Sequence, residues 1–184
     1  MICGGMRFIA ASLRRWTRQE SGMALMETAF LFPVLLVMLL GVYDVGHAIT
    51  VNHKMITASN VAADLLTRTQ SVSSSELDQA IKAAGLAMNP YANENNIGID
   101  IISVQYDEDD DPEILWRESR NMGDGLQADA AARSFGLGTK GEGVLMVTVL
   151  YDYTPTFGSM VINAFRMREV AFSRGRRSSV VTRD

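Results

Sequence analysis

An α+β fold is predicted for this chain of 184 residues: a long N-terminal helix laid on a small antiparallel sheet. Two observations predict it. Between Gly46 and Gly85 there is neither glycine nor proline, and apolar residues recur there every three or four positions, as on one face of a helix. Beyond residue 96, short apolar or alternating segments are separated by turn-forming residues, which is typical of strands. The length allows one modest domain.

The helix is expected to start as a membrane span. Residues 28–43 carry no charge, and extending the run back to Met23 gives about 31 Å of helix, enough for a hydrocarbon core of about 30 Å. The extension includes Glu27. A carboxylate at the centre of a membrane helix costs about 2.5–3.5 kcal/mol, so it usually has a partner or a function. The alternative is that Glu27 reaches back to the headgroups and ends the span.

The flanking charges predict the orientation of this span. Arg14, Arg15 and Arg18 precede it, and Lys54 is the first basic residue after it. The excess of positive charge on one side places the N-terminus in the cytoplasm and residues 44–184 outside. A secretory signal cleaved after Ala48 would need a shorter apolar stretch. A plain signal anchor explains the length and the orientation but leaves Glu27 unexplained.

Composition limits the function further. The whole chain has a net charge of −4, of which the basic residues 1–22 contribute +3, so residues 23–184 carry −7; this argues against nucleic acid as a partner. The single cysteine, Cys3, lies in that N-terminus, so the rest of the chain has neither a disulfide nor a thiolate metal site. An acidic middle (residues 94–129) and an arginine-rich tail (residues 166–184) invite pairing within one molecule or between neighbours, although two solvated faces are the simpler interpretation.

Residues 18–46, RQESGMALMETAFLFPVLLVMLLGVYDVG, carry a spaced set of residues across the basic flank and the span. The set is Glu20, Gly22, Glu27, Ala29, Pro33, Gly41, Asp44 and Gly46. This pattern resembles the N-terminus of the TadE-like family, minor pseudopilins of the tight-adherence (Flp) pilus system. The strong resemblance covers about residues 14–50, and beyond them only the pilin-like architecture is shared.

The resemblance implies that a prepilin peptidase cuts after Gly22 and leaves Met23 as the new N-terminus. Glu27 then lies one helical turn on, where it can neutralise the new ammonium or that of a neighbouring subunit and so set how subunits dock. Pro33, common at this position in the family, either kinks the span or is simply tolerated. Thr28 replaces the aromatic residue usual in major pilins, which favours a minor or assembly-initiating subunit.

The resemblance therefore implies a non-enzymatic, single-pass protein of the bacterial inner membrane, without a cofactor. Its expected partners are other pilins or pseudopilins, the pilus assembly platform and the peptidase, and its role lies in pilus assembly, adhesion and biofilm formation. We expect a leader at 1–22, a span at 23–43, a stalk at 44–70 and an extracytoplasmic domain at 71–184. The alternative is an uncleaved, signal-anchored periplasmic scaffold or binding protein. No nucleophile elbow or paired-carboxylate site supports a hydrolase.

The stalk is predicted to reach about Thr69 and to pack on the domain through one apolar stripe, with a wider flank. Asn52 and Ser59 interrupt the stripe, which either permits helix–helix contacts or marks a wet edge; the wet edge is the favoured interpretation. The stripe is Val45, Ile49, Asn52, Ile56, Ser59, Ala63 and Leu66, and the flank is Val51, Met55, Ala58, Ala62 and Leu65.

A second helix is expected after an N-cap at Ser75 and is stopped by Asn89-Pro90. Strands are predicted at residues 97–106, 113–118, 143–153 and 167–173. The first two form a hairpin across an acidic turn. The third is apolar on both faces and should be central, with the fourth beside it.

Other polar groups indicate no site. Residues 107–111 could bind Ca²⁺, but a solvated acidic turn is favoured because the alternating ligand spacing is missing. His47 and His53 do not share a helical face as paired ligands would, so no metal site is predicted. Lys140 lies in a glycine-rich loop outside a phosphate-binding context. The tail arginines either touch lipid headgroups or form an exposed strand edge; they are Arg174, Arg176, Arg177 and Arg183.

Overall fold

The computed structural model describes residues 20–93, 96–158 and 163–184. Most of the expected leader, residues 1–19, lies outside this part. The chain divides into two compact units. The N-terminal unit ends at Asp44, and its described part is residues 20–44; the second unit is a domain of residues 45–184. One element, the 47-residue helix α2 (Glu20–Leu66), contributes to both units.

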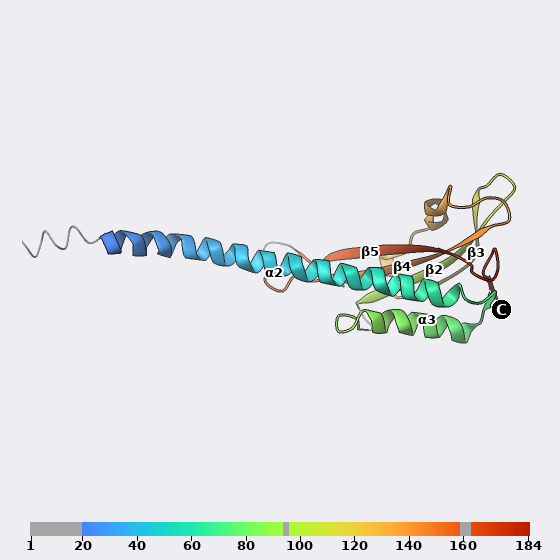
Figure 1. The fold of residues 1–184 in the computed structure, drawn as a ribbon, viewed down its shortest axis with the longest axis horizontal. Helices are drawn as coiled ribbons and strands as arrows, with labels where there is room; N and C mark the ends of the chain where they lie inside the picture. Colours follow the sequence, from blue (N-terminus) through green and yellow to red (C-terminus); the bar gives the residue numbers. More distant parts are fainter. Residues whose placement is uncertain (1–19, 94–95, 159–162) are drawn as a thin grey trace, which may run out of the picture. The chain divides into compact units, whose positions relative to one another are not determined.

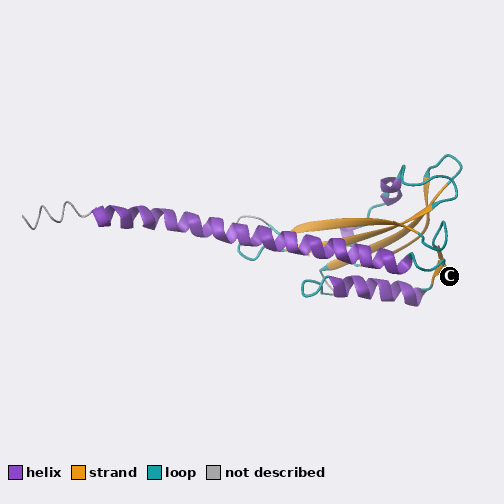
Figure 2. Cartoon of the chain, viewed as in Figure 1, coloured by secondary structure: helices purple, strands orange, loops and turns teal. Residues whose placement is uncertain are grey.

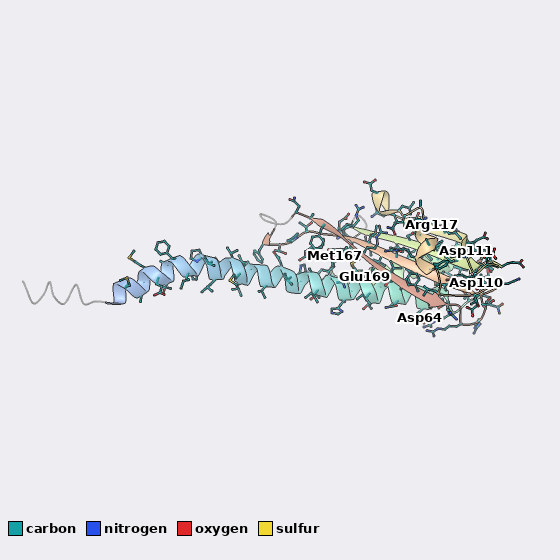
Figure 3. All side chains as sticks on the ribbon, turned by 90° about the horizontal axis from the view of Figure 1, so that it is seen from above. Asp64, Asp110, Asp111, Arg117, Met167 and Glu169 are labelled. Carbon is teal, nitrogen blue, oxygen red and sulfur yellow. The ribbon has the colours of Figure 1, made fainter. Side chains whose placement is uncertain are left out.

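The N-terminal unit is apolar helix on all sides. Large hydrophobic side chains from Met23 to Tyr43 are exposed, and Figure 3 shows side chains projecting all around this part of α2. The helix continues on both sides of Pro33. A helix that is hydrophobic all round belongs in a bilayer or in a protein core, because no polar face is left for water. By length and composition, α2 is able to cross a membrane.

The domain is α+β, as predicted from the sequence. Its sheet has the order β3-β2-β4-β5 and is antiparallel throughout. The strands are β2 (Ile97–Tyr106), β3 (Pro112–Arg120), β4 (Gly143–Tyr153) and β5 (Phe165–Arg174). The part of α2 beyond residue 44 and the helix α3 (Ser74–Ala87) lie along one face of this sheet (Figures 1 and 2).

The predicted strand pairing is confirmed. β2 and β3 form a hairpin across the acidic turn, with a register shift between Ser103 and Val104. β4 lies between β2 and β5, and only Asp152 of its residues is exposed. A strand paired on both edges and covered on both faces has no polar surface to present, which explains its nearly continuous apolar sequence.

The main core lies between the sheet and the two helices. It contains inward residues of β2 and β4, such as Ile101, Leu145 and Val147, packed on small residues of α2 and α3. A smaller cluster on the opposite face joins Ile102 and Met146 to the short 3-10 helix η2 (Ala130–Ser134). The helix α3 was expected from the sequence, although its place in the main core was not, and η2 was not expected at all.

The predicted packing face of the stalk is rotated from the true one. Val45, Ile49 and Ile56 of the expected stripe are exposed. The buried side is centred on the expected flank and includes Val51, Met55, Ala58, Ser59, Ala62, Ala63 and Leu66. Alanines dominate it because a small side chain lets the helix approach the sheet closely. The helix also ends at Leu66, three residues before the expected Thr69.

Ser59 is buried, so its interpretation as part of a wet edge was wrong. Its hydroxyl donates to the carbonyl of Ile56 at 3.0 Å. A hydroxyl that is bonded to its own helix can be buried at little cost, because no donor is left without an acceptor.

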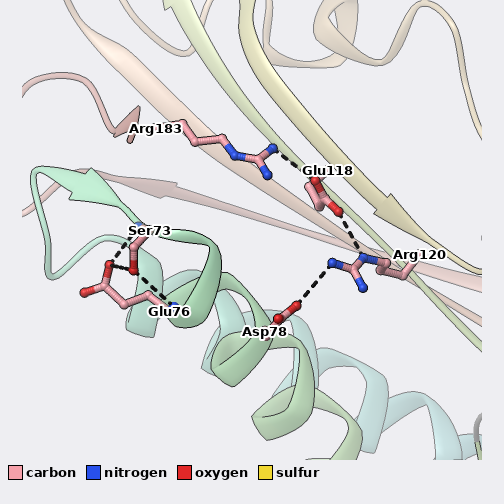
Figure 4. A network of polar contacts seen from close by, with 6 residues as sticks. All are labelled: Ser73, Glu76, Asp78, Glu118, Arg120 and Arg183. Carbon is pink, nitrogen blue, oxygen red and sulfur yellow. Dashed lines mark hydrogen bonds and ion pairs between the residues drawn. The ribbon is translucent and has the colours of Figure 1, made fainter.

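The helix α3 begins two residues earlier than expected, with Ser73 rather than Ser75 as its N-cap. The Ser73 hydroxyl accepts the backbone N–H of Glu76, and the Glu76 carboxylate accepts the backbone N–H of Ser73 at 2.9 Å. This reciprocal pair is a capping box, and it satisfies two backbone donors at once (Figure 4). The helix ends at Ala87, just before the predicted stop at Asn89-Pro90.

The C-terminal tail is tied to the domain. The short strands β1 (Ser71–Val72) and β6 (Thr182–Arg183) pair in parallel. Arg183 bonds to Glu118, which also bonds to Arg120, and Arg120 reaches Asp78 on α3 (Figure 4). In addition, Arg174 pairs with Glu142 and Arg176 with Asp64. The tail and the acidic middle therefore pair within one molecule, at least through Arg183 and Glu118.

Candidate functional site in the N-terminal helix

The predicted site residues lie on one element. Gly22, Met23, Glu27 and Pro33 all belong to the first fourteen residues of α2, and all four are exposed. Gly22 and Met23 are adjacent, and Glu27 follows Met23 by four positions. Residues four apart on a helix are neighbours, with Cβ atoms about 5–6 Å apart. The structure therefore places Glu27 on the same side of the helix as Met23, one turn away.

Gly22 weakens the helix locally. Glycine costs about 1 kcal/mol relative to alanine inside a helix. Opening the helix at this residue to an extended strand is therefore less costly than at its neighbours. A Cβ added at Gly22 would meet no heavy atom within 4 Å. The described part of the chain tolerates a larger side chain here, so any intolerance would come from a partner enzyme.

Glu27 is the only charged residue between residues 22 and 43. The surrounding surface is apolar, including Met23, Phe30 and Leu31. In lipid, a lone carboxylate in such a surface has a strong preference for a cation, because water is not there to solvate it. A positive group on a neighbouring chain or at a newly formed N-terminus would meet that need.

Thr28 is the polar neighbour of Glu27, and the structure shows how its hydroxyl is satisfied. The Thr28 Oγ1 donates to the carbonyl of Ala24 at 2.8 Å, across one turn of α2. Thr50 and Thr57 make the same kind of bond farther along the helix. No pattern of residue types explains why a threonine is tolerated at this position. A hydroxyl bonded within its own helix can face lipid without an unpaired donor.

The acidic turn at residues 107–111 is organised by the protein itself. The Asp107 carboxylate accepts the backbone N–H groups of Asp109 and Asp111, each at 2.9 Å. The Asp110 carboxylate accepts the N–H of Lys140 at 2.6 Å, and the Lys140 ammonium bonds to Glu108. Figure 3 shows Asp110 and Asp111 on the turn itself. These acids hold the turn and join it to the glycine-rich loop.

The two histidines are not brought together. His47 is partly buried and its Nδ1 lies 3.3 Å from the Tyr153 hydroxyl, whereas His53 is exposed. Among the described residues, no group of three or more His, Cys, Asp or Glu side chains is placed to hold a metal ion.

The described chain combines an apolar helix long enough to cross a membrane with a small α+β domain, which is the architecture expected of an anchored, pilin-like protein. Residues 22–64 match the family model described as TadE-like protein, and this match supports assignment of the helical segment to that family. The matched range starts at Gly22 and ends near the C-terminus of α2, so the sheet lies outside it. TadE-like proteins are related to the Tad pilus. Neither a curated protein nor a solved structure gives a significant match.

Proposed function

We propose that this chain is a minor pilin-like subunit that takes part in the assembly of a tight-adherence pilus. Residues 23–43 anchor it in the bacterial inner membrane, with the N-terminus in the cytoplasm and the domain outside. The carrying observation is a single carboxylate, Glu27, exposed on an apolar helix one turn after the Gly22–Met23 bond, within the range that matches the TadE-like family. The function is structural, through association with other pilins and the assembly platform, and it serves adhesion and biofilm formation.

In this proposal a prepilin peptidase removes residues 1–22. The arginines at 14, 15 and 18 hold the cleavage bond at the cytoplasmic face of the membrane, and the chain around Gly22 opens to enter the enzyme. Cleavage creates an ammonium on Met23. Glu27 then neutralises it, or neutralises the ammonium of an adjacent subunit. Such a pair adds little net stability, because desolvation offsets the attraction, but it fixes the register of two helices.

The leading test is the N-terminal sequence of the native protein purified from membranes. We expect the mature chain to begin MALMETAF. Gly22→Leu should retain the leader, because the bulky side chain obstructs the cleft of the peptidase, whereas Gly22→Ala should still be cut to a measurable extent. Since the chain itself has room at this position, a failure of Gly22→Leu to mature would not result from misfolding.

A native protein that still begins with its arginine-bearing segment would refute the processing step. That result would favour the alternative function, an uncleaved signal-anchored scaffold of the cell envelope. A mature chain beginning at Ile49 would instead mean ordinary secretion and would remove the anchor.

The docking step is tested by changing Glu27 alone. Glu27→Ala and Glu27→Gln should be processed and inserted normally but should lose co-purification with other pilins, because both remove the charge. Glu27→Asp keeps the charge on a shorter side chain and should retain part of the association. Equal association of Glu27→Gln and the unchanged protein would show that the carboxylate has no docking role.

A further inference from the structure

One end of the domain carries a cluster of aromatic rings. The His47 ring contacts Tyr91 edge-on, with centroids 5.1 Å apart, and lies 5.6 Å from the ring of Tyr153. Tyr153 in turn lies 5.3 Å from Phe165. These four residues come from α2, the loop after α3, the end of β4 and the start of β5. We call His47, Tyr91, Tyr153 and Phe165 the aromatic end of the domain.

The cluster is close to the expected span along the chain. His47 is four residues after Tyr43, the last residue of the apolar run. Four residues reach at most about 14 Å, even when fully extended. The polar headgroup layer adds about 5–8 Å on each side of the hydrocarbon core. However the two units are oriented, the contact of His47 with Tyr91 and Tyr153 keeps the aromatic end at or near the headgroup layer.

The surface chemistry of this end suits lipid headgroups. Phe165 is 44% exposed, and Phe157, four residues after Tyr153 along the chain, is 47% exposed. Tyrosine and other amphipathic rings gather at membrane–water interfaces, where one side is apolar and the other wet. Exposed phenylalanines beside bonded tyrosines fit that environment better than they fit water.

We propose that the aromatic end docks on the lipid headgroup layer, so that the domain rests on the membrane from which its anchor emerges. Phe165 enters the layer with Tyr153 beside it, and Phe157, four residues after Tyr153 along the chain, enters it as well. This inference rests on the membrane span of the proposed function but not on cleavage or on association with pilins. The outer leaflet is chosen over a second protein chain because the short connection to Tyr43 brings lipid to this end in every copy.

The test uses the full-length chain in nanodiscs that hold one copy each. Cys3→Ser removes the only cysteine, and single cysteines at positions 157, 165 and 172 then carry an environment-sensitive fluorophore. Phe172 is the matched control: it lies on β5 like Phe165, is 42% exposed, and is seven residues or about 23 Å farther along the strand. Lipids with a doxyl quencher near the headgroup report contact.

We expect quenching by the shallow doxyl lipid to be severalfold greater at positions 157 and 165 than at 172. In the chain labelled at 157, Phe165→Ser should reduce the quenching, and Phe172→Ser should leave it unchanged. Equal quenching at all three positions would overturn the assignment to this end. A blue-shifted fluorophore that lipid does not quench would also overturn it, since protein would then cover the site. Failure of the chain to integrate into the bilayer would likewise overturn the proposal. Loss of pilin association in Glu27→Gln, with quenching kept, would separate the two proposals.

Discussion

The two units of this chain use apolar residues in opposite ways. Between Met23 and Tyr43, α2 exposes its large hydrophobic side chains on all sides. From Val51 onward the same helix buries one side only, with small residues such as Ala58 beside large ones such as Met55, against a sheet. The difference teaches that the distribution of apolar residues around the helix, and not hydrophobicity alone, separates a helix made for lipid from a helix made for a protein core. The small residues on the buried side let the two backbones approach.

The comparison predicts that equal truncations have unequal effects in the two units. Leu145→Ala, in the core at 1% exposure, should lower the free energy of unfolding of the domain by about 3–4 kcal/mol, because the cavity left behind cannot collapse fully. Leu35→Ala, at 60% exposure, should leave it unchanged. Urea denaturation in detergent, followed by Trp116 fluorescence, measures both. A large loss of domain stability in Leu35→Ala would break the comparison.

Substitutions of acidic residues in the two units should also have unequal effects on the stability of the domain. The Asp100 carboxylate accepts two hydrogen bonds from Arg117, at 2.9 and 2.7 Å, and the two side chains are 3% and 19% exposed. Asp100→Asn should cost about 2–3 kcal/mol, less than a fully buried pair because Arg117 keeps some water. Glu27→Gln should not change domain stability, although it should change association. The same denaturation experiment tests Asp100→Asn. The control is Asp152→Asn, which removes the carboxylate of the exposed ion pair with Arg166 and should lower the free energy of unfolding by less than about 1 kcal/mol.

Substitution of the N-cap of α3 should lower the stability of the domain by a smaller amount, and it tests which serine caps the helix. Ser73→Ala should destabilise the domain by about 1 kcal/mol, because the N–H of Glu76 loses its acceptor and the capping box is broken. Ser75→Ala should cost only a few tenths. Equal losses for the two variants in thermal or urea denaturation would favour the cap expected from the sequence over the cap in the structure.

The smallest expected effect depends on pH. Hydrogen bonding to Arg120, and then to Arg183, holds the pKa of Glu118 below its ordinary value of 4.5 despite partial burial. A carboxyl group with a lower pKa in the folded state stabilises the protein above the unfolded pKa, and this contribution is lost as the pH falls through the folded pKa. We therefore expect stability to decrease below about pH 4.5, and Glu118→Gln to decrease less over that interval. If the free energy of unfolding of Glu118→Gln falls with pH as steeply as that of the unchanged protein, Glu118 does not contribute to this pH dependence.

The sequence predicted those features that have a strong local signal. The centre strand β4 and both bounds of β2 were correct because their apolar patterns are long and are bounded by turns. The two-residue strands β1 and β6 are too short to show a period. The rotation of the stalk also escaped prediction, because two overlapping apolar stripes fit one helix and only the sheet decides between them.

The placement of Gly22, Met23 and Glu27 on one helix could be predicted, because it depends only on spacing along that helix. Their roles in cleavage and docking stay predictions. The bond from Thr28 to Ala24 was not foreseen, since no pattern of residue types announces it. The aromatic end could not be predicted from the sequence for a different reason. His47 and Tyr153 are 106 positions apart, and only tertiary packing brings them together.

The parallel pairing of β1 with β6 has a mechanical consequence. The Thr182 N–H donates to the carbonyl of Gln70, and the Asp184 N–H donates to that of Val72. If the stalk and residue 184 are pulled apart, these two strands slide in opposite directions, so their hydrogen bonds are loaded together in shear. The β1–β6 pair then carries the tension between those two points. The chain of the sheet lies in the loop between the two strands, so tension along the backbone bypasses it while this pair holds, and only side-chain links such as Arg183 with Glu118 pass load to the sheet.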